Sequence, residues 1–139
     1  MISRRDVIRV RIPFPTINSA LASNSHMYIC HKANSDAIRL IKCQTLKPYM
    51  LGSDLFKHYV DENPDPSRNP FKHVTRIDCD KEFEVFNLDF DESLKTTIRP
   101  NISKDLMTRV EEELDHSELQ IIHIDQDQMR ILNRMVTIR

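Results

Sequence analysis

Glycine is almost missing from this chain, because Gly52 is the only one among 139 residues. The phosphate-binding P-loop, the dinucleotide-binding fingerprint and the nucleophile elbow of serine hydrolases each need several glycines at fixed spacing. These three types of site are therefore excluded. Long apolar runs are missing as well, since no stretch approaches the roughly 18 residues of a membrane-spanning helix. The N-terminus "MISRRDVIRVRIPF" has no signal-peptide core, so we expect a cytoplasmic protein without a membrane partner.

Metal-binding motifs are also missing. The chain has three cysteines, which are Cys30, Cys43 and Cys79. They form no C-x-x-C pair, no H-x-x-x-H pair accompanies them, and each lies in a strand-like run, so we expect buried, reduced side chains. The stretch "DCDKEFE" places Asp78, Asp80 and Glu82 at alternate positions like a calcium loop, but Phe83 stands where that loop needs glycine. We expect neither a metal nor a cofactor.

The composition is otherwise that of an ordinary globular protein, with 40% hydrophobic and 29% charged residues. A chain of 139 residues is long enough to bury one core, so we expect a single domain over residues 1–139. The formal charge of −1 provides no overall attraction for nucleic acid. A nucleic-acid site would therefore need a local basic patch.

Alternating apolar and polar residues dominate the first part of the chain. The run "DVIRVRI" places Ile8, Val10 and Ile12 on one face, as in a half-buried strand. The runs at His26–Lys32 and Ala37–Leu46 are also strand-like. Because "ANSD" between them favours a tight turn, the two runs predict a hairpin.

The middle of the chain is less regular. Three prolines among polar residues in "DENPDPSRNPF" predict a long loop over Pro48–Phe71. Alternation returns in "HVTRIDC", "EFEVFNL" and "LQIIHI", with another short strand near "KTTIRP", so we expect at least five strands in a curved, antiparallel sheet. Ser103 can cap a helix in "KDLMTRVEEELDHS", and Asp125, followed by Gln128, can cap another in "DQDQMRILNRM". Together these elements predict a β-dominated α+β fold or a small barrel.

Side chains that can transfer protons or bind phosphate collect in loops and at strand ends. They are His26, Thr45, Lys47, Arg68, Lys72, His73 and Arg76. RNA cleavage without a metal needs a base for the 2′-OH proton, a cation for the phosphorane and an acid for the leaving 5′-oxygen. Histidine suits either proton role. A structural role is the alternative: His26 can be a hydrogen-bonding strand end, and Arg68 can bind a carboxylate within its own loop.

Four segments, in this order, resemble the PemK/MazF family of mRNA interferase toxins. "RRDV" is similar to the opening motif of the family, with Arg5 in place of glycine, and Thr45 in "KCQTLKP" falls at the family's active-site Thr or Ser. "IDCDK" is similar to a later family segment that ends in Asp-Lys, and "ISKDLMTRVEEEL" is similar to the family's helix. The resemblance covers roughly residues 3–116 and leaves residues 117–139 as a C-terminal extension.

The resemblance implies a fold, a substrate and partners. The fold is a small SH3-like antiparallel barrel with a packed C-terminal helix, and the chain forms a homodimer. Single-stranded RNA is the substrate, and an antitoxin protein is the inhibitory partner. The sequence departs from the family where the polar segment 19–24 ends, because Ser25-His26 stands in the place of the catalytic Arg-Pro pair.

Two functions follow from the sequence. The first is a metal-independent endoribonuclease in which attack by the 2′-OH leaves a 2′,3′-cyclic phosphate. Its catalytic residues would be His26, Thr45, Arg68 and His73, and its substrate-binding residues would be Lys47, Lys72, Arg76 and Ser25. The second is a non-catalytic module on the same fold that binds a protein or nucleic-acid partner, which the missing Arg-Pro pair and the low net charge favour.

Overall fold

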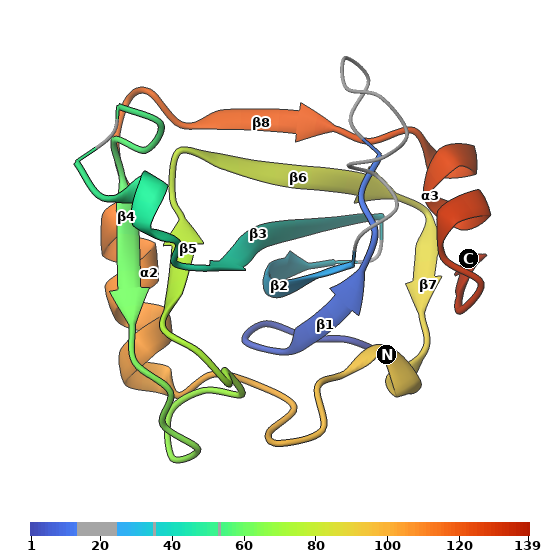
Figure 1. The fold of residues 1–139 in the computed structure, drawn as a ribbon. Helices are drawn as coiled ribbons and strands as arrows, with labels where there is room; N and C mark the ends of the chain where they lie inside the picture. Colours follow the sequence, from blue (N-terminus) through green and yellow to red (C-terminus); the bar gives the residue numbers. More distant parts are fainter. Residues whose placement is uncertain (14–24, 35, 53) are drawn as a thin grey trace.

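The computed structural model describes residues 1–13, 25–34, 36–52 and 54–139. The polar segment expected over 19–24 lies outside these ranges. The described residues form the β-dominated α+β fold that the sequence predicts, with a seven-stranded sheet, a two-stranded sheet and two α-helices (Figure 1). Neither of these two helices has the length and apolar character needed to cross a membrane.

The larger sheet consists of β1 (Val7–Val10), β2 (His26–Ala33), β3 (Ala37–Thr45), β4 (Tyr59–Glu62), β5 (Thr75–Asp78), β6 (Lys81–Phe86) and β8 (Gln120–His123). The smaller sheet consists of β7 (Leu88–Phe90) and β9 (Val136–Ile138). The α-helices are α2 (Lys104–Leu114) and α3 (Gln126–Leu132). Two 3₁₀ turns are η1 (Pro48–Met50) and η2 (Glu92–Leu94).

Strand β3 is the centre of the larger sheet. It pairs with β2 along one side, while on the other side its first half pairs with β6 and its last residues pair with β5. These pairs are antiparallel, whereas β6 and β8 run parallel. The predicted hairpin is confirmed as β2–β3, and in its turn the Asn34 side chain accepts the N–H groups of Asp36 at 3.0 Å and Ala37 at 2.8 Å. The pairings among the described strands follow an open order from β1 to β4.

Both faces of the larger sheet are buried, because alternate residues of β2 enter different cores. Tyr28 and Cys30 belong to a cluster with residues of β6, β7, α3 and β9, whereas Ile29 belongs to a cluster with residues of β3, β5 and α2. Helices α2 and α3 accordingly lie on opposite sides of the molecule (Figure 1). The period of two in the sequence therefore separates two cores, rather than one core from solvent.

Both helices begin where the sequence predicts. The Ser103 hydroxyl accepts the Leu106 N–H at 3.2 Å, and the Asp125 carboxylate accepts the Gln128 N–H at 2.8 Å. Each bond satisfies a donor that has no partner within the first helical turn. The buried stripe of α2 consists of Leu106, Met107, Val110 and Leu114. It has the helical spacing seen in the sequence, and it holds α2 against the sheet.

The three cysteines are free and buried, which confirms the prediction. Burial raises the pKa of the Cys30 thiol to about 12, and it raises the pKa of the Cys43 and Cys79 thiols as well. Because the thiolate is the reactive and metal-binding form, these protonated side chains act as small core residues.

Three parts of the fold differ from the prediction. The stretch Pro48–Phe71 is not a continuous loop, because β4 forms within it and pairs with β5. The prediction of a strand near "KTTIRP" is wrong. Within the described chain this segment forms only an isolated bridge between Lys95 and Ile8, and Pro100 has no N–H that could extend a ladder of hydrogen bonds. Strand β9 is not predicted from the sequence, because its three residues are too few to show an alternation of apolar and polar side chains. Residues 117–139 contribute β8, which pairs with β6, and β9, which pairs with β7.

Candidate functional site

A cavity of about 300 Å³ lies where β2 begins and β3 ends. Its lining consists of Arg9, Ser25, His26, Met27, Cys43, Thr45, Phe71, Lys72, His73 and Thr75. Five of these residues are site residues expected from the sequence, namely Ser25, His26, Thr45, Lys72 and His73. The fold therefore brings the hydroxyl of Thr45, at the end of β3, into the same cavity as His26 and His73, which are far apart in the sequence.

Strand pairing explains why these residues meet. Strands β2 and β3 are antiparallel with Met27 opposite Cys43, so the same register, continued by two positions, places Ser25 opposite Thr45. On the other side of β3, Thr45 lies opposite Thr75 of β5. The start of β2, the end of β3 and the start of β5 thus form one corner of the sheet.

The proline-rich segment before β5 forms the remaining wall, and a buried asparagine orders it. The Asn69 amide donates to the Asn63 carbonyl at 3.0 Å. Its oxygen accepts the N–H of Phe71 at 3.1 Å and that of Asp65 at 3.3 Å. Phe71 packs into the core beneath α2. These contacts fix the backbone immediately before Lys72, so the residues that reach the cavity mouth are carried by an ordered loop.

His26 lies in an environment that disfavours its charged form. Its side chain is half-buried, and this burial, followed by the positive charges of Lys42 and Arg9, lowers the pKa of the imidazole below its ordinary value of 6.5. At neutral pH the ring is therefore uncharged and can accept a proton. His73, by contrast, is exposed at the cavity mouth. The cavity thus holds two imidazoles in different environments.

A second cavity of about 640 Å³ adjoins the first, because both are lined by Arg9, Met27 and Lys72. The rest of its lining comes from Pro70 and the segment 93–98. Lys95 of this segment is paired with Asp6 at 3.2 Å and with Glu92 at 2.7 Å. No carboxylate of the described residues lines either cavity. We call the two cavities together the basic groove; Arg9 and Lys72 lie where they join.

Three expected site residues are not part of the groove lining. Arg68 binds Glu62 through two nitrogens, at 3.0 and 2.6 Å. Arg76 is buried and binds both carboxylate oxygens of Asp61, at 2.8 and 2.9 Å, with its guanidinium 3.7 Å from the centre of the Tyr59 ring. Lys47 is exposed just before η1.

Arg9 is the groove residue that sequence reasoning missed. In the sequence it belongs to a basic, solvated strand face, and the structure confirms that it is exposed between buried neighbours. The pairing of Arg9 with Met27 brings it beside the start of β2. An arginine on the exposed face of β1, next to a hairpin that begins with histidine, is the signal that could have revealed it.

No family model, curated protein or solved structure matches this chain. The function is therefore inferred from the residues of the basic groove.

Proposed function

We propose that this chain is a metal-independent endoribonuclease that cleaves single-stranded RNA. The observation that carries the proposal is the basic groove, in which no carboxylate of the described residues lies; its lining includes His26, His73, Thr45, Lys72 and Arg9. A groove of this charge suits a phosphodiester backbone. Two imidazoles beside one bound phosphate are the groups that acid–base cleavage of RNA needs.

The two histidines divide the proton transfers. His26, whose pKa is lowered by burial, Lys42 and Arg9, takes the proton from the 2′-OH. The 2′-oxygen then attacks phosphorus, the bond from phosphorus to the 5′-oxygen breaks, and a 2′,3′-cyclic phosphate forms. His73 gives a proton to the leaving 5′-oxygen. Acid–base catalysis by a positioned group contributes about 10²–10⁴-fold to such a reaction.

The cations and the hydroxyl stabilise and orient the reacting phosphate. Arg9 and Lys72 bind the phosphate oxygens and offset the charge that develops on the phosphorane. Thr45, which lines the same cavity as His26, donates its hydroxyl to a phosphate oxygen. The second cavity then receives the neighbouring nucleotide.

A backbone feature supports the resemblance to the PemK/MazF family and, through it, the SH3-like barrel. Arg5 stands where that family keeps glycine, and its φ of 80° lies in the left-handed region that glycine adopts most easily. The catalytic Arg-Pro pair of the family is Ser25-His26 in this chain. In the proposal Arg9, on the neighbouring strand, provides the missing guanidinium. The same resemblance extends the proposal to a cytoplasmic homodimer with an antitoxin partner.

The test uses purified protein, a labelled single-stranded RNA and EDTA. We expect cleavage with a 2′,3′-cyclic phosphate product, and no cleavage of the matching DNA, which lacks the 2′-OH. His26→Ala and His73→Ala should each lower the cleavage rate by about 100-fold or more. The control is His123→Ala, because this exposed residue of β8 pairs with Glu84 and does not line the groove.

Binding without cleavage is the second candidate function. It is favoured by the contact between Glu62 and Arg68, because Arg68 is expected from the sequence to be catalytic but is bound to this carboxylate. RNA that binds and stays intact would support this module and refute the nuclease. A cleavage rate that neither histidine variant changes would refute the proton-transfer roles proposed for His26 and His73.

A further inference from the structure

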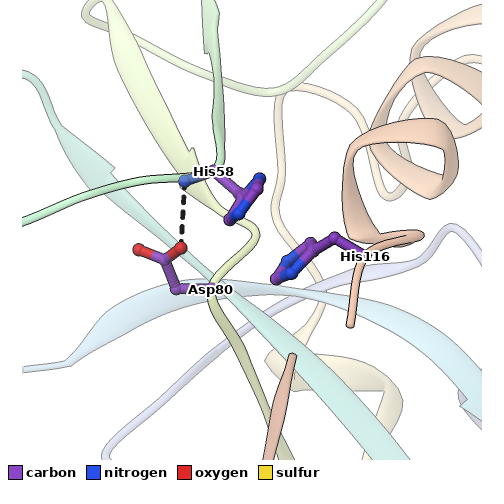
Figure 2. A group of neighbouring side chains, drawn as sticks. All are labelled: His58, Asp80 and His116. Atoms are coloured by element: carbon purple, nitrogen blue, oxygen red, sulfur yellow. Dashed lines mark hydrogen bonds between the residues drawn. The ribbon is translucent and has the colours of Figure 1, made fainter. Parts of the chain in front are cut away.

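A second group of titratable side chains lies apart from the basic groove. Figure 2 shows His58, Asp80 and His116, whose possible ligand atoms all lie within 4.8 Å of one another. His58 immediately precedes β4, Asp80 is in the turn between β5 and β6, and His116 follows α2. None of the three residues lines the cavities of the groove. Two imidazoles and a carboxylate are the ligand types that borderline transition metals such as Zn²⁺ prefer.

Hydrogen bonds orient the side chains of His116 and Asp80. His116 donates its Nε2–H to the Cys79 carbonyl at 2.7 Å, and its Nδ1 accepts the Glu118 N–H at 3.2 Å. Nδ1 is therefore the ligand atom, and a metal would take the place of the longer bond from Glu118. A metal-bound histidine commonly donates its other N–H to a carbonyl, as His116 does to Cys79. The Asp80 carboxylate accepts the backbone N–H groups of Lys57 at 3.0 Å and His58 at 2.9 Å, and each of its oxygens keeps a further lone pair.

Further carboxylates surround the same point. The Glu113 carboxylate lies 3.7 Å from Nδ1 of His58, and the Glu118 carboxylate lies 3.9 Å from Nε2. Both residues are partly or fully exposed, so either can move to provide a fourth ligand. With Asp80 they place three negative charges around two imidazoles, and Lys57 offsets one of them through its contact with Glu118 at 3.3 Å.

The rings of His58 and His116 must change their relative orientation before both can bind one metal ion. The rings of His58 and His116 are stacked, with centroids 3.6 Å apart and planes 12° from parallel, so their in-plane lone pairs do not converge. Ligand atoms on one tetrahedral Zn²⁺ are roughly 3.3 Å apart, given bonds of about 2.0–2.1 Å. His58 must therefore turn its ring toward Asp80. Its ring is accessible to solvent and its two acidic neighbours are beyond 3.5 Å, so this rotation breaks no short bond to either of them.

We propose that His58, Asp80 and His116 form a binding site for Zn²⁺ or a similar divalent transition metal. Nδ1 of His116, a nitrogen of His58 and an oxygen of Asp80 are the protein ligands, and Glu113 or Glu118 completes a tetrahedral set. The ion ties the end of α2 to the β5–β6 turn and to the start of β4. Its role is structural and independent of the proposed nuclease, which needs no metal.

The test is a titration of metal-free protein with Zn²⁺ alone, followed by calorimetry, and with Co²⁺, followed by visible absorption. We expect one equivalent to bind and the thermal midpoint to rise. His58→Gln and His116→Gln should each weaken Zn²⁺ binding by about 10–100-fold or more, since the loss of even a supporting contact has an effect of this size. His123→Gln, a change in an exposed histidine outside the cluster, should bind Zn²⁺ as the original chain does.

The outcomes separate this site from the groove. Zn²⁺ binding that survives both His58→Gln and His116→Gln would overturn the proposal, and so would a chain that binds no Zn²⁺ at micromolar concentration. Circular dichroism shows whether each variant is folded; if His116→Gln unfolds, His58→Gln decides alone, because its ring supports no short hydrogen bond to its acidic neighbours. RNA cleavage in EDTA is measured separately, so failure of one proposal leaves the other open to its own test.

Discussion

Replacing Asn69 by alanine should weaken both the fold and the groove. Asn69 is completely buried, and its side chain makes three hydrogen bonds, to the backbone of Asn63, Asp65 and Phe71. At about 1 kcal/mol each, their loss amounts to about 3 kcal/mol. The Phe71 N–H lies in a buried bond, so leaving it without a partner brings the expected total to about 3–4 kcal/mol.

Urea unfolding followed by circular dichroism measures this change. The matched control is Asn34→Ala, which removes the same type of side chain from the exposed β2–β3 turn. Water can reach the two N–H groups released there, so we expect a loss of about 1 kcal/mol or less. An Asn69→Ala variant that loses no more stability than Asn34→Ala would refute the view that Asn69 orders the loop.

The same variant connects loop order to the groove. Because Asn69 fixes the backbone just before Lys72, the Asn69→Ala chain should bind RNA more weakly even where it remains folded. Normal RNA binding by the folded variant would mean that the loop reaches its position without Asn69.

Two further predictions concern pH and packing. The lowered pKa of His26 means that the unfolded chain takes up a proton near pH 6.5 more readily than the folded chain, so stability should fall as the pH falls below about 6.5. His26→Gln should reduce this loss between about pH 7.5 and 5.5, and an identical pH dependence in both chains would contradict it. Leu106→Ala in the buried face of α2 should cost about 2–5 kcal/mol of unfolding free energy. Leu55→Ala, at a position with 65% exposure, should change it by less than about 0.5 kcal/mol, and equal losses would show that α2 is not packed as described.

Local signals in the sequence predict much of the fold. The β2–β3 hairpin and both helix caps depend on neighbouring residues, so their patterns are visible in short windows. Strand β4 is hidden because two of its four residues, Asp61 and Glu62, are adjacent carboxylates, so the segment shows no alternation of apolar and polar residues, and prolines follow it. It forms because β5 offers it a partner, and such long-range pairing overrides weak local preference.

For the candidate site, the sequence predicts the types of side chain but not how they are arranged in space. Residue types in loops point to His26 and His73, and the register of the hairpin then explains why they share a cavity with Thr45. Their catalytic roles stay predictions. Sequence patterns do not reveal which arginine pairs with a carboxylate. Arg68 binds Glu62, six residues earlier in the chain, whereas no carboxylate of the described residues accompanies Arg9 in the groove lining. The cluster at His58 has no motif either, because its three residues are far apart in the chain.

The position of β1 has a consequence for the order of folding. On one side β1 pairs with β2, and on the other side the Val7 carbonyl accepts the Thr96 N–H at 3.0 Å, across 89 residues of chain. Contacts between such distant segments form slowly, because the loop between them must first be closed. The second cavity, which is lined both by Arg9 of β1 and by the segment 93–98, is therefore complete only when this late contact is made. A partly folded chain would have its helices and hairpin before it has a complete site, so the function of the groove would appear in the last step of folding.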